Sequence, residues 1–371
     1  MSKQQQAATG PQAASERVAS IGPQNGGKNG GKILCFGEML LRFSPNQNEL
    51  LLQSPALTAR PGGAEANVAV ALARFGAPAA MATVLPDNAL GQAARDEVRR
   101  YGVDASPVVF APGRMGLYFL TPGAVRRPSE VLYDRAGSAF VERVADAFDW
   151  DALLDGYEWL HVSGVTPATG PNGSRAAVDL VEAAVRNGVR VSYDGNFRGK
   201  LWEQWAGDPP ATLGKMLAGA EVAFADDRDF ALVLGRKFED ADPHARRRLA
   251  AAAAFDAYPH LQRIACTLRV QESVADQALS AVMLTRGADG EVIETATDAI
   301  HMTGVVDRVG GGDAFASGVL FGLWSGWSDQ EALDFGLAAA GLKHSIPGDF
   351  NLFTAAEVRA AMGDGGFDIR R

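Results

Sequence analysis

Apolar residues occur in short runs that are separated by glycine, proline and polar residues from residue 32 onward. The first run, Ile33-Leu34-Cys35-Phe36, ends at Gly37 and is typical of a buried strand. Similar runs recur along the chain. Together they predict strands over residues 33–36, 79–85, 158–162, 189–193, 221–225, 261–267 and 278–284.

Segments with a helical pattern lie between these strands. Residues 89–101 and 174–186 are predicted helices, and a glycine that can end a helix follows closely after each. Other helices are predicted to end at Phe75 and Leu234, again before a glycine. Strands alternating with helices predict an α/β fold: a doubly wound, mainly parallel sheet between helices. In such sheets, ligands gather at the carboxyl ends of the strands.

Two segments depart from this alternation. Residues 41–59 are interrupted by prolines, and the strand-like runs at 115–120 and 131–135 are joined by a polar connection. We expect them to form a small separate sheet, a lid made of about residues 41–60 and 114–136. Tyr118, Tyr133 and Arg135 are then candidates to reach over a polar ligand; the alternative is a surface sheet with ordinary exposed aromatics.

Composition and charge narrow the class of protein. The 371 residues suit one large α/β domain with an appendage, or two small domains. Apolar content of 47% and charged content of 21% are ordinary for a soluble enzyme. The net charge of −9 argues against a nucleic-acid partner, and the one dense basic run, Arg246-Arg247-Arg248, is typical of the polar face of a helix.

The compartment is predicted from what the sequence lacks. Cys35 and Cys266 lie far apart in apolar runs, which favours buried free thiols over a disulfide or a metal pair. No apolar run reaches membrane-spanning length, so we expect no membrane association. Residues 1–31 are rich in Gln, Ala and Gly and have no apolar signal core. We therefore expect a disordered N-terminal tail and a cytoplasmic protein.

The strongest chemical signal is Gly310-Gly311-Gly312-Asp313, which runs into a predicted helix. A glycine turn that opens a helix presents free N–H groups and the positive end of a dipole, which suits a phosphate. An aspartate there is unexpected in a pure anion site. It is explained if Asp313 takes a proton from a hydroxyl while the amides stabilise charge on phosphate oxygens. The alternative is that Asp313 only caps the helix.

A second glycine pair, Gly62-Gly63, also precedes a helix. One interpretation is that this helix end meets a substrate, with Asn67 offering its amide. The other is a tight turn required by helix packing.

Polar residues follow several of the predicted strands. Arg198 suits a carboxylate or a phosphate because its guanidinium binds in a bidentate fork; its alternative role is an ion pair with Asp194. Asp226 and Asp229 are candidate Mg²⁺ ligands, or simply an acidic helix start. Residues 267–269 are expected at the end of another strand.

These motifs occur together in one family. The chain resembles the ribokinase-like (PfkB-type) carbohydrate kinases from Ile33 to about residue 360, through its stretches 61–69 and 307–315. Within the family it is similar to the 2-keto-3-deoxygluconate kinases. That narrower similarity rests on residues 133–139, 161–167, 194–198 and 342–350.

The resemblance implies a kinase domain over residues 32–365, with the lid over the sugar site and often mediating a homodimer or a higher oligomer. It implies ATP and Mg²⁺, and transfer of the γ-phosphate to the terminal hydroxyl of a keto-deoxy sugar acid. It leaves a requirement for a monovalent cation such as K⁺ open.

The resemblance also implies roles for individual residues. Asp313 is the general base, and Gly310, Gly311 and Gly312 form the anion hole. The expected sugar and carboxylate contacts are Gly62, Gly63, Asn67, Tyr118, Tyr133, Arg135 and Arg198. The expected nucleotide contacts are Gly310 and Gly312 of the glycine motif together with Asp226, Thr267 and Arg269, which are chosen for their place at strand ends. Asp226 and Asp229 are the expected metal ligands.

The chain departs from the family at two places. Asp226 stands where many relatives carry Asn, and residues 266–272 lack the usual glycine-rich, Lys-containing nucleotide loop. Two rival functions therefore stay open: the same chemistry on fructose, a nucleoside or the galacto epimer, and a non-catalytic sugar-binding regulator. The intact Asp313 favours an enzyme.

Overall fold

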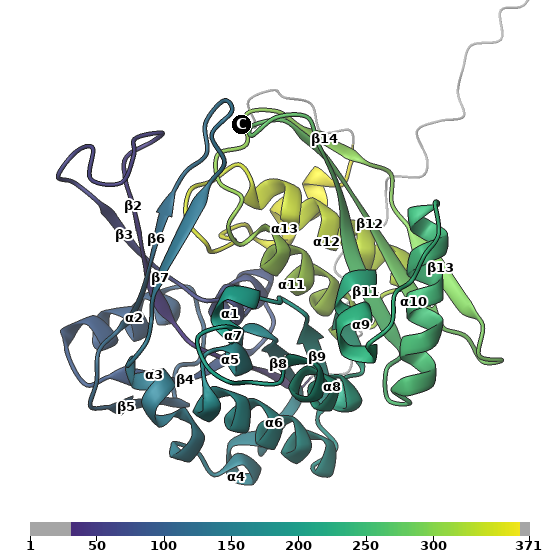
Figure 1. The fold of residues 1–371 in the computed structure, drawn as a ribbon, viewed down its shortest axis with the longest axis horizontal. Coiled ribbons are helices and arrows are strands. Elements are labelled where there is room, and N and C mark those ends of the chain that lie inside the picture. Colours follow the sequence, from purple (N-terminus) through teal and green to yellow (C-terminus); the bar gives the residue numbers. More distant parts are fainter. Residues whose placement is uncertain (1–30, 364–371) are drawn as a thin grey trace, which may run out of the picture. The chain divides into compact units, whose positions relative to one another are not determined.

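The computed structural model describes residues 31–363, so the predicted tail lies outside the described residues except for Gly31. Two sheets organise this part of the chain (Figure 1). The larger, ten-stranded sheet has the order β13-β12-β11-β10-β9-β8-β1-β4-β5, with β14 paired to β12. Its strands are β1 (Lys32–Phe36), β4 (Ala79–Pro86), β5 (Val108–Ala111), β8 (Tyr157–Ser163), β9 (Arg190–Asp194), β10 (Val222–Phe224), β11 (Arg263–Gln271), β12 (Gln277–Arg286), β13 (Val292–Ala296) and β14 (Ile300–Met302).

The centre of this sheet is parallel, from β5 through β4, β1, β8, β9 and β10 to β11. Only the far edge is antiparallel, because β11 and β12 form a hairpin and β12 also pairs with β13 and β14. The parallel strands place their carboxyl ends at one edge, where ligands bind in sheets of this type.

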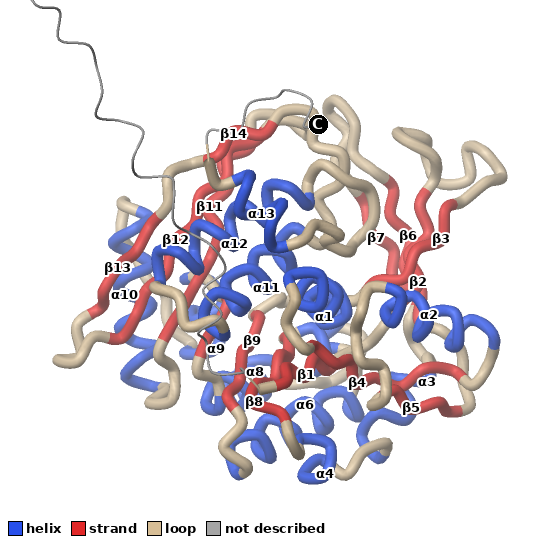
Figure 2. Tube along the Cα trace, turned by 180° about the vertical axis from the view of Figure 1, so that it is seen from behind, coloured by secondary structure: helices blue, strands red, loops and turns tan. Residues whose placement is uncertain are grey.

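Helices cover both faces of the large sheet (Figure 2). The longer ones are α1 (Ala64–Phe75), α2 (Ala89–Arg100), α6 (Pro171–Arg186), α8 (Pro209–Gly219), α9 (Asp227–Leu234), α10 (Pro243–Ala257), α11 (Gly311–Trp324) and α12 (Asp329–Lys343). The shorter ones are α3 (Ala139–Arg143), η1 (Val144–Asp146), α4 (Trp150–Leu154), α5 (Val165–Ala168), α7 (Gly199–Trp202) and α13 (Ala355–Ala361).

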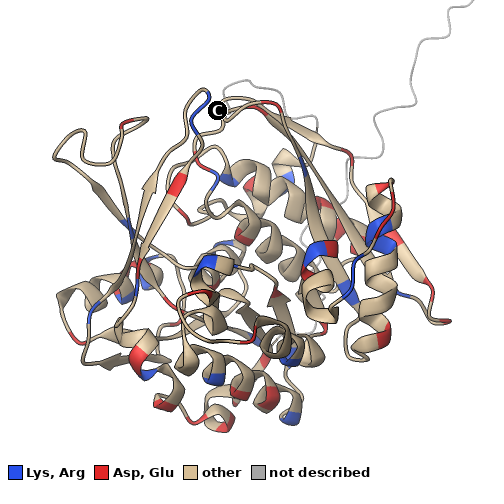
Figure 3. Cartoon of the chain, viewed as in Figure 1, with Lys and Arg blue, Asp and Glu red and all other residues tan. Residues whose placement is uncertain are grey.

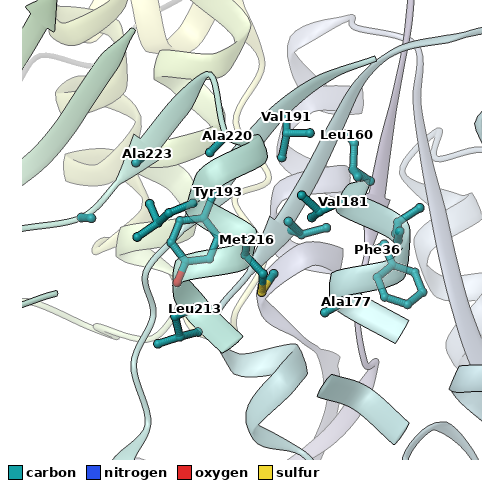
Figure 4. Close-up of a cluster of buried hydrophobic side chains, with 14 of the residues drawn as sticks. Phe36, Leu160, Ala177, Val181, Val191, Tyr193, Leu213, Met216, Ala220 and Ala223 are labelled. Carbon is teal, nitrogen blue, oxygen red and sulfur yellow. The ribbon is translucent and has the colours of Figure 1, made fainter. Parts of the chain in front are cut away.

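Each face of the sheet has its own core. Along β1, Leu34 and Phe36 belong to one buried cluster and Ile33 and Cys35 to the other, because successive strand residues point to opposite faces. Figure 4 shows part of the first cluster, in which Val181 of α6 and Met216 of α8 lie near the sheet residues. The second cluster contains the buried faces of α1, α11 and α12. A strand buried on both faces explains the continuous apolar runs in the sequence.

The smaller sheet has four strands in the order β3-β2-β6-β7: β2 (Leu40–Ser44), β3 (Thr58–Gly62), β6 (Gly116–Thr121) and β7 (Glu130–Asp134). β2 runs parallel to β6, while its pairing with β3 and the pairing of β6 with β7 are antiparallel. This sheet is built from the two segments that the sequence analysis assigned to a lid. We call it the lid sheet.

The strand prediction needs one correction. Strand β11 does not end at Thr267 but continues to Gln271, since Thr267 and Arg269 pair with Ala281 and Leu279 of β12. The antiparallel hairpin supplies backbone hydrogen bonds that the alternating pattern of the parallel strands did not indicate. Strands β5, β13 and β14 were also missed.

Charged residues of both signs are mixed on the helices of residues 31–363, and in the view of Figure 3 no large basic patch offsets the negative net charge. Figure 3 shows basic and acidic residues interspersed along the helices. On α10, Arg246 and Arg248 pair with Asp227 and Glu294, so this basic run is balanced locally. Cys35 and Cys266 are free cysteines. Within residues 31–363, no helix is both long and apolar enough to span a membrane.

Candidate active site

A cavity of about 500 Å³ lies among the carboxyl ends of the strands, the start of α11 and the lid sheet. It brings together residues from segments that are far apart in the sequence. Among the predicted site residues, those that line it are Gly63, Asn67, Tyr118, Tyr133, Arg135, Arg198, Gly310, Gly312 and Asp313.

Asp313 faces this cavity from the first turn of α11. The N-cap of the helix is Gly310, and no side chain caps it, so Asp313 is not a helix cap. Asn67 Nδ2 of α1 donates a hydrogen bond to Asp313 Oδ2 at 2.6 Å. Burial raises the pKa of the Asp313 carboxyl to about 6, although the bond from Asn67 opposes this rise. A carboxylate with this pKa suits proton abstraction near neutral pH.

The glycine turn beside Asp313 is required by its neighbours. Gly310 has a positive φ of 82°, and a Cβ there would overlap the backbone carbonyl of Asp349. A Cβ at Gly311 would press on the ring of His344, whereas one at Gly312 would meet nothing within 4 Å. Among the described residues, the N–H groups of Gly312 and Asp313 donate to no acceptor. The turn therefore offers free donors next to open space, as an anion site requires.

Asp349 connects the lid sheet to the glycine turn. The Tyr118 hydroxyl of β6 donates to Asp349 Oδ2, and Arg42 Nη1 of β2 lies 2.8 Å from Asp349 Oδ1. Arg42 Nη2 also lies 2.7 Å from Asp307 Oδ2, so one buried guanidinium bridges two carboxylates. Burial raises the pKa of Tyr118, with the Asp349 charge as the next cause. Tyr118 is therefore a neutral donor at the cavity wall.

The three arginines that line the cavity differ in their partners. Arg135 is buried and its guanidinium is engaged by Glu38, whose other oxygen accepts from Ser138 Oγ at 2.6 Å. Arg198 and Arg308 have no carboxylate within salt-bridge distance among residues 31–363. The ion pair that offered an alternative role for Arg198, with Asp194, is thus not formed in this structure. Arg198 is free to bind an anion.

Asp194 adds a second carboxyl to the cavity floor at the end of β9. Burial raises its pKa well above the usual range, and the charge of Asp313 raises it further, while Arg198 opposes the rise. Two carboxyls that interact in this way do not both ionise easily, which leaves Asp194 as the more readily protonated partner.

Several predicted residues lie outside the cavity lining. Gly62 and Gly311 lie behind it, against Asp349 and His344. Thr267 and Arg269 lie within the β11–β12 ladder. Asp226 and Asp229 form a capping box at the start of α9, where Asp226 also binds Arg228. The pair therefore forms an acidic helix start, and it can also contribute to a Mg²⁺ site, because Asp229 Oδ1 accepts no hydrogen bond among the described residues.

Sequence reasoning missed Glu38, Asp349 and Arg308 as cavity residues. Glu38 follows directly after the first strand and Gly37, a strand end like those that drew attention elsewhere. Arg308 lies two residues before the glycine turn, where its charge was a signal that could have been used. Asp349 lies in the stretch 342–350 that supported the family resemblance, but its role follows only from its contacts with Arg42 and Tyr118.

Comparison with known proteins agrees with this geometry. A family model described as pfkB family carbohydrate kinase matches residues 31–351. The chain is 31% identical to a 2-dehydro-3-deoxygalactonokinase of Haloferax volcanii, over 91% of this chain and 99% of that protein. It is 26% identical to a 2-dehydro-3-deoxygluconokinase of Bacillus subtilis, over 86% of this chain and 91% of that protein.

A solved structure resembles the fold closely. The 2-dehydro-3-deoxygluconokinase of Thermotoga maritima matches with a TM-score of 0.83 and 35% identity, covering 90% of this chain and 100% of that one. This match confirms the predicted α/β fold. The match of the family model over most of the chain, together with the aspartate and glycine turn in the cavity, shows that this chain belongs to the pfkB family of carbohydrate kinases.

Proposed function

We propose that this kinase phosphorylates the terminal hydroxyl of a keto-deoxy sugar acid with ATP. The observation that carries the proposal is a single cavity in which Asp313 and the open glycine turn face Arg198, a guanidinium without a carboxylate partner among residues 31–363. A sugar acid supplies both the hydroxyl and the carboxylate that this arrangement accommodates. The similarity to two keto-deoxy sugar acid kinases supports this substrate class.

The proposed reaction is a phosphoryl transfer in which bonds and protons balance. The substrate hydroxyl oxygen bonds to the γ-phosphorus, the bond from that phosphorus to the β-phosphate oxygen breaks, and ADP leaves. The hydroxyl proton passes to Asp313, and the N–H groups of Gly312 and Asp313 stabilise charge on the phosphate oxygens. The lid residues Tyr118 and Tyr133 hold the sugar.

Mg²⁺ needs few protein ligands in such a site, because the nucleotide phosphates and water provide most of its coordination. Asp229 fits this limited role better than Asp226, since both oxygens of Asp226 accept hydrogen bonds from the residues that follow it. When bound, the ion neutralises charge on the phosphates. Residues 31–363 hold no cluster of three or more potential His, Cys, Asp or Glu ligands that suggests another metal site.

The galacto epimer is a second candidate substrate. The Haloferax volcanii relative is a 2-dehydro-3-deoxygalactonokinase and the Thermotoga maritima relative a 2-dehydro-3-deoxygluconokinase, at 31% and 35% identity. This small difference in identity favours neither epimer.

An ADP-release assay with a substrate panel tests the proposal. The panel contains both keto-deoxy epimers, fructose and adenosine. We expect at least one keto-deoxy acid to give a kcat/KM at least about tenfold above fructose, because the acid gains a charge-assisted hydrogen bond. A preference for fructose or adenosine, or ATP consumption independent of any sugar, would contradict the substrate assignment.

The variant Arg198→Ala serves as the matched test of the carboxylate contact. It should raise KM for the preferred acid more than KM for fructose. Equal effects on the acid and the neutral sugar would remove Arg198 from that role.

A further inference from the structure

Arg308 is a cavity residue to which neither the sequence motifs nor the proposed mechanism gives a role. It lies in the loop that leads into the glycine turn, and Gly311 N–H donates to its carbonyl oxygen at 3.3 Å. Its side chain is held from behind, because Nη2 donates to the backbone carbonyls of Ser273, at 3.0 Å, and of Val274. Carbonyl acceptors fix the guanidinium without cancelling its charge.

The guanidinium of Arg308 retains donors for a ligand. Nη1 makes no hydrogen bond with residues 31–363, and no carboxylate among them lies within salt-bridge distance; Nε is buried and also has no partner. Burial lowers the pKa of Arg308, so the protein holds this charge at a cost. A positioned cation without a counter-charge is expected where an anion binds.

A second arginine adds to this field. Arg269 of β11 makes no hydrogen bond or ion pair with the described residues through its side chain. Arg269 is exposed at the outer end of β11, and the partial desolvation of its guanidinium lowers its pKa, with repulsion from Arg308 lowering it further. Burial lowers the pKa of His344, which packs against Gly311, and the charges of Arg269, Lys343 and Arg308 lower it further. Arg269 thus adds its charge to that of Arg308.

The position of this group indicates which anion it serves. Arg308 is anchored to the turn between β11 and β12, and these strands lie on the opposite side of α11 from the lid sheet (Figures 1 and 2). Arg198, at the start of α7, is already the proposed contact for the substrate carboxylate, and Arg135 is neutralised by Glu38. A polyanion approaching the glycine turn from the β11–β12 side meets Arg308 first.

We propose that Arg308, assisted by the charge of Arg269, binds the β- and γ-phosphates of the nucleotide. Residues 266–272 contain no lysine and no glycine, and Arg269 is the one basic residue among them, so the positive charge here comes from Arg269 and Arg308. This inference rests on the proposed function only for the identity of the nucleotide. It does not depend on which sugar acid is the substrate.

Titration calorimetry with the β,γ-imido analogue of ATP, in the presence of Mg²⁺, tests the inference on the full chain. Losing a charge-assisted hydrogen bond removes about 1.5–3 kcal/mol, so Arg308→Met should weaken analogue binding by about 10- to 150-fold. AMP, which lacks the β- and γ-phosphates, should bind the variant and the wild type within about twofold. Arg308→Lys should recover part of the loss, because the charge remains without the fork.

The control is Arg186→Met, which removes the same charge from an exposed arginine of α6 that pairs with Asp151. It should bind the analogue like the wild type. Melting temperatures of all variants show whether each one is folded. If Arg308→Met fails to fold, the comparison of Arg308→Lys with the wild type carries the test, with a loss of at least about threefold expected.

Three outcomes would overturn the inference: analogue affinity within twofold of wild type in the folded Arg308 variant, an equal loss of AMP binding, or a rise in KM for the sugar acid alone. Failure of the proposed function gives a different pattern. The wild type would then bind the analogue and the Arg308→Met variant would bind it more weakly, yet the wild type would phosphorylate neither keto-deoxy acid.

Discussion

The chemistry of the site is set by carboxyl groups that burial makes hard to ionise. The pKa of Asp313 is raised to about 6 and that of Asp194 well above its usual range, in both cases chiefly by burial. The hydrogen bond from Asn67 opposes the rise at Asp313. Burial and this hydrogen bond are the two largest influences on the pH at which Asp313 can accept a proton, ahead of the charges of Asp349, Arg198 and Lys343.

This balance predicts the pH dependence of the reaction. A base must be deprotonated, so kcat/KM should fall about tenfold per pH unit below about pH 6, where Asp313 becomes protonated. Asn67→Ala removes the bond that favours the charged form, so the acid limb of the profile should move to higher pH. Initial rates between pH 5 and 9 measure both effects.

The matched control for this profile is Asn172→Ala, which removes an amide that donates to backbone carbonyls on the surface, at Val141 and Glu142. It should leave the acid limb in place. An unchanged limb in Asn67→Ala would show that another group controls the profile.

The role of a residue could be predicted from the sequence where its functional partners are its neighbours in the chain. The glycine turn and Asp313 stand next to each other in the sequence, so their shared role was visible. Asp349 and Arg42 are separated by 307 positions, and Glu38 and Arg135 by 97. No local pattern indicates such pairs, and the structure shows that Arg135, expected to bind the substrate carboxylate, has its charge compensated by Glu38.

The first turn of α1 contains a buried acid that the proposed mechanism does not use. Glu65 Oε1 accepts from Ser163 and Thr166, while Oε2 has no hydrogen-bond partner among the described residues. Burial raises the pKa of Glu65 from 4.5 to about 7. Across this range the folded state holds a proton that the unfolded state has released, so stability falls as the pH rises.

We predict that Glu65→Gln removes this pH dependence. The amide keeps an acceptor for Ser163 and Thr166 and carries no charge at any pH. Relative to the wild type, the free energy of unfolding of the variant should rise between pH 5 and pH 8 by up to about 3 kcal/mol. Urea unfolding at the two pH values measures it.

The control Glu203→Gln changes an exposed side chain in the same way and should show no such difference between pH 5 and pH 8. If the free energy of unfolding changes between pH 5 and pH 8 by the same amount in Glu65→Gln and in the wild type, Glu65 is ionised in the folded protein. The raised pKa assigned to Glu65 is then wrong.

At the scale of elements, most of the parallel strands followed from apolar runs of four to seven residues. The elements that were missed or shortened lie at the edges of the sheet. Strand β5 is half-buried, and the outer part of β11 carries Arg269, Val270 and Gln271 on exposed positions. Edge strands need no continuous apolar run, so their pairing with β4 and β12 was not visible in the pattern.

At the scale of the molecule, the lid sheet and the catalytic turn are joined by one buried network. Arg42 of the lid sheet contacts Asp307, which precedes the glycine turn, and Asp349, whose carbonyl packs against Gly310. A movement of the lid sheet would therefore reach the turn through rigid, charged contacts. An oligomer formed through the lid stays a prediction; Leu132 of β7 is 60% exposed there.

The most direct test of the account is the turnover of Asp313→Asn with the preferred keto-deoxy acid. The account predicts that kcat falls by about 10²–10⁴ while the affinity for the ATP analogue and the melting temperature stay close to those of the wild type. A folded Asp313→Asn enzyme that turns over at nearly the wild-type rate would contradict the central claim that Asp313 is the base of this kinase.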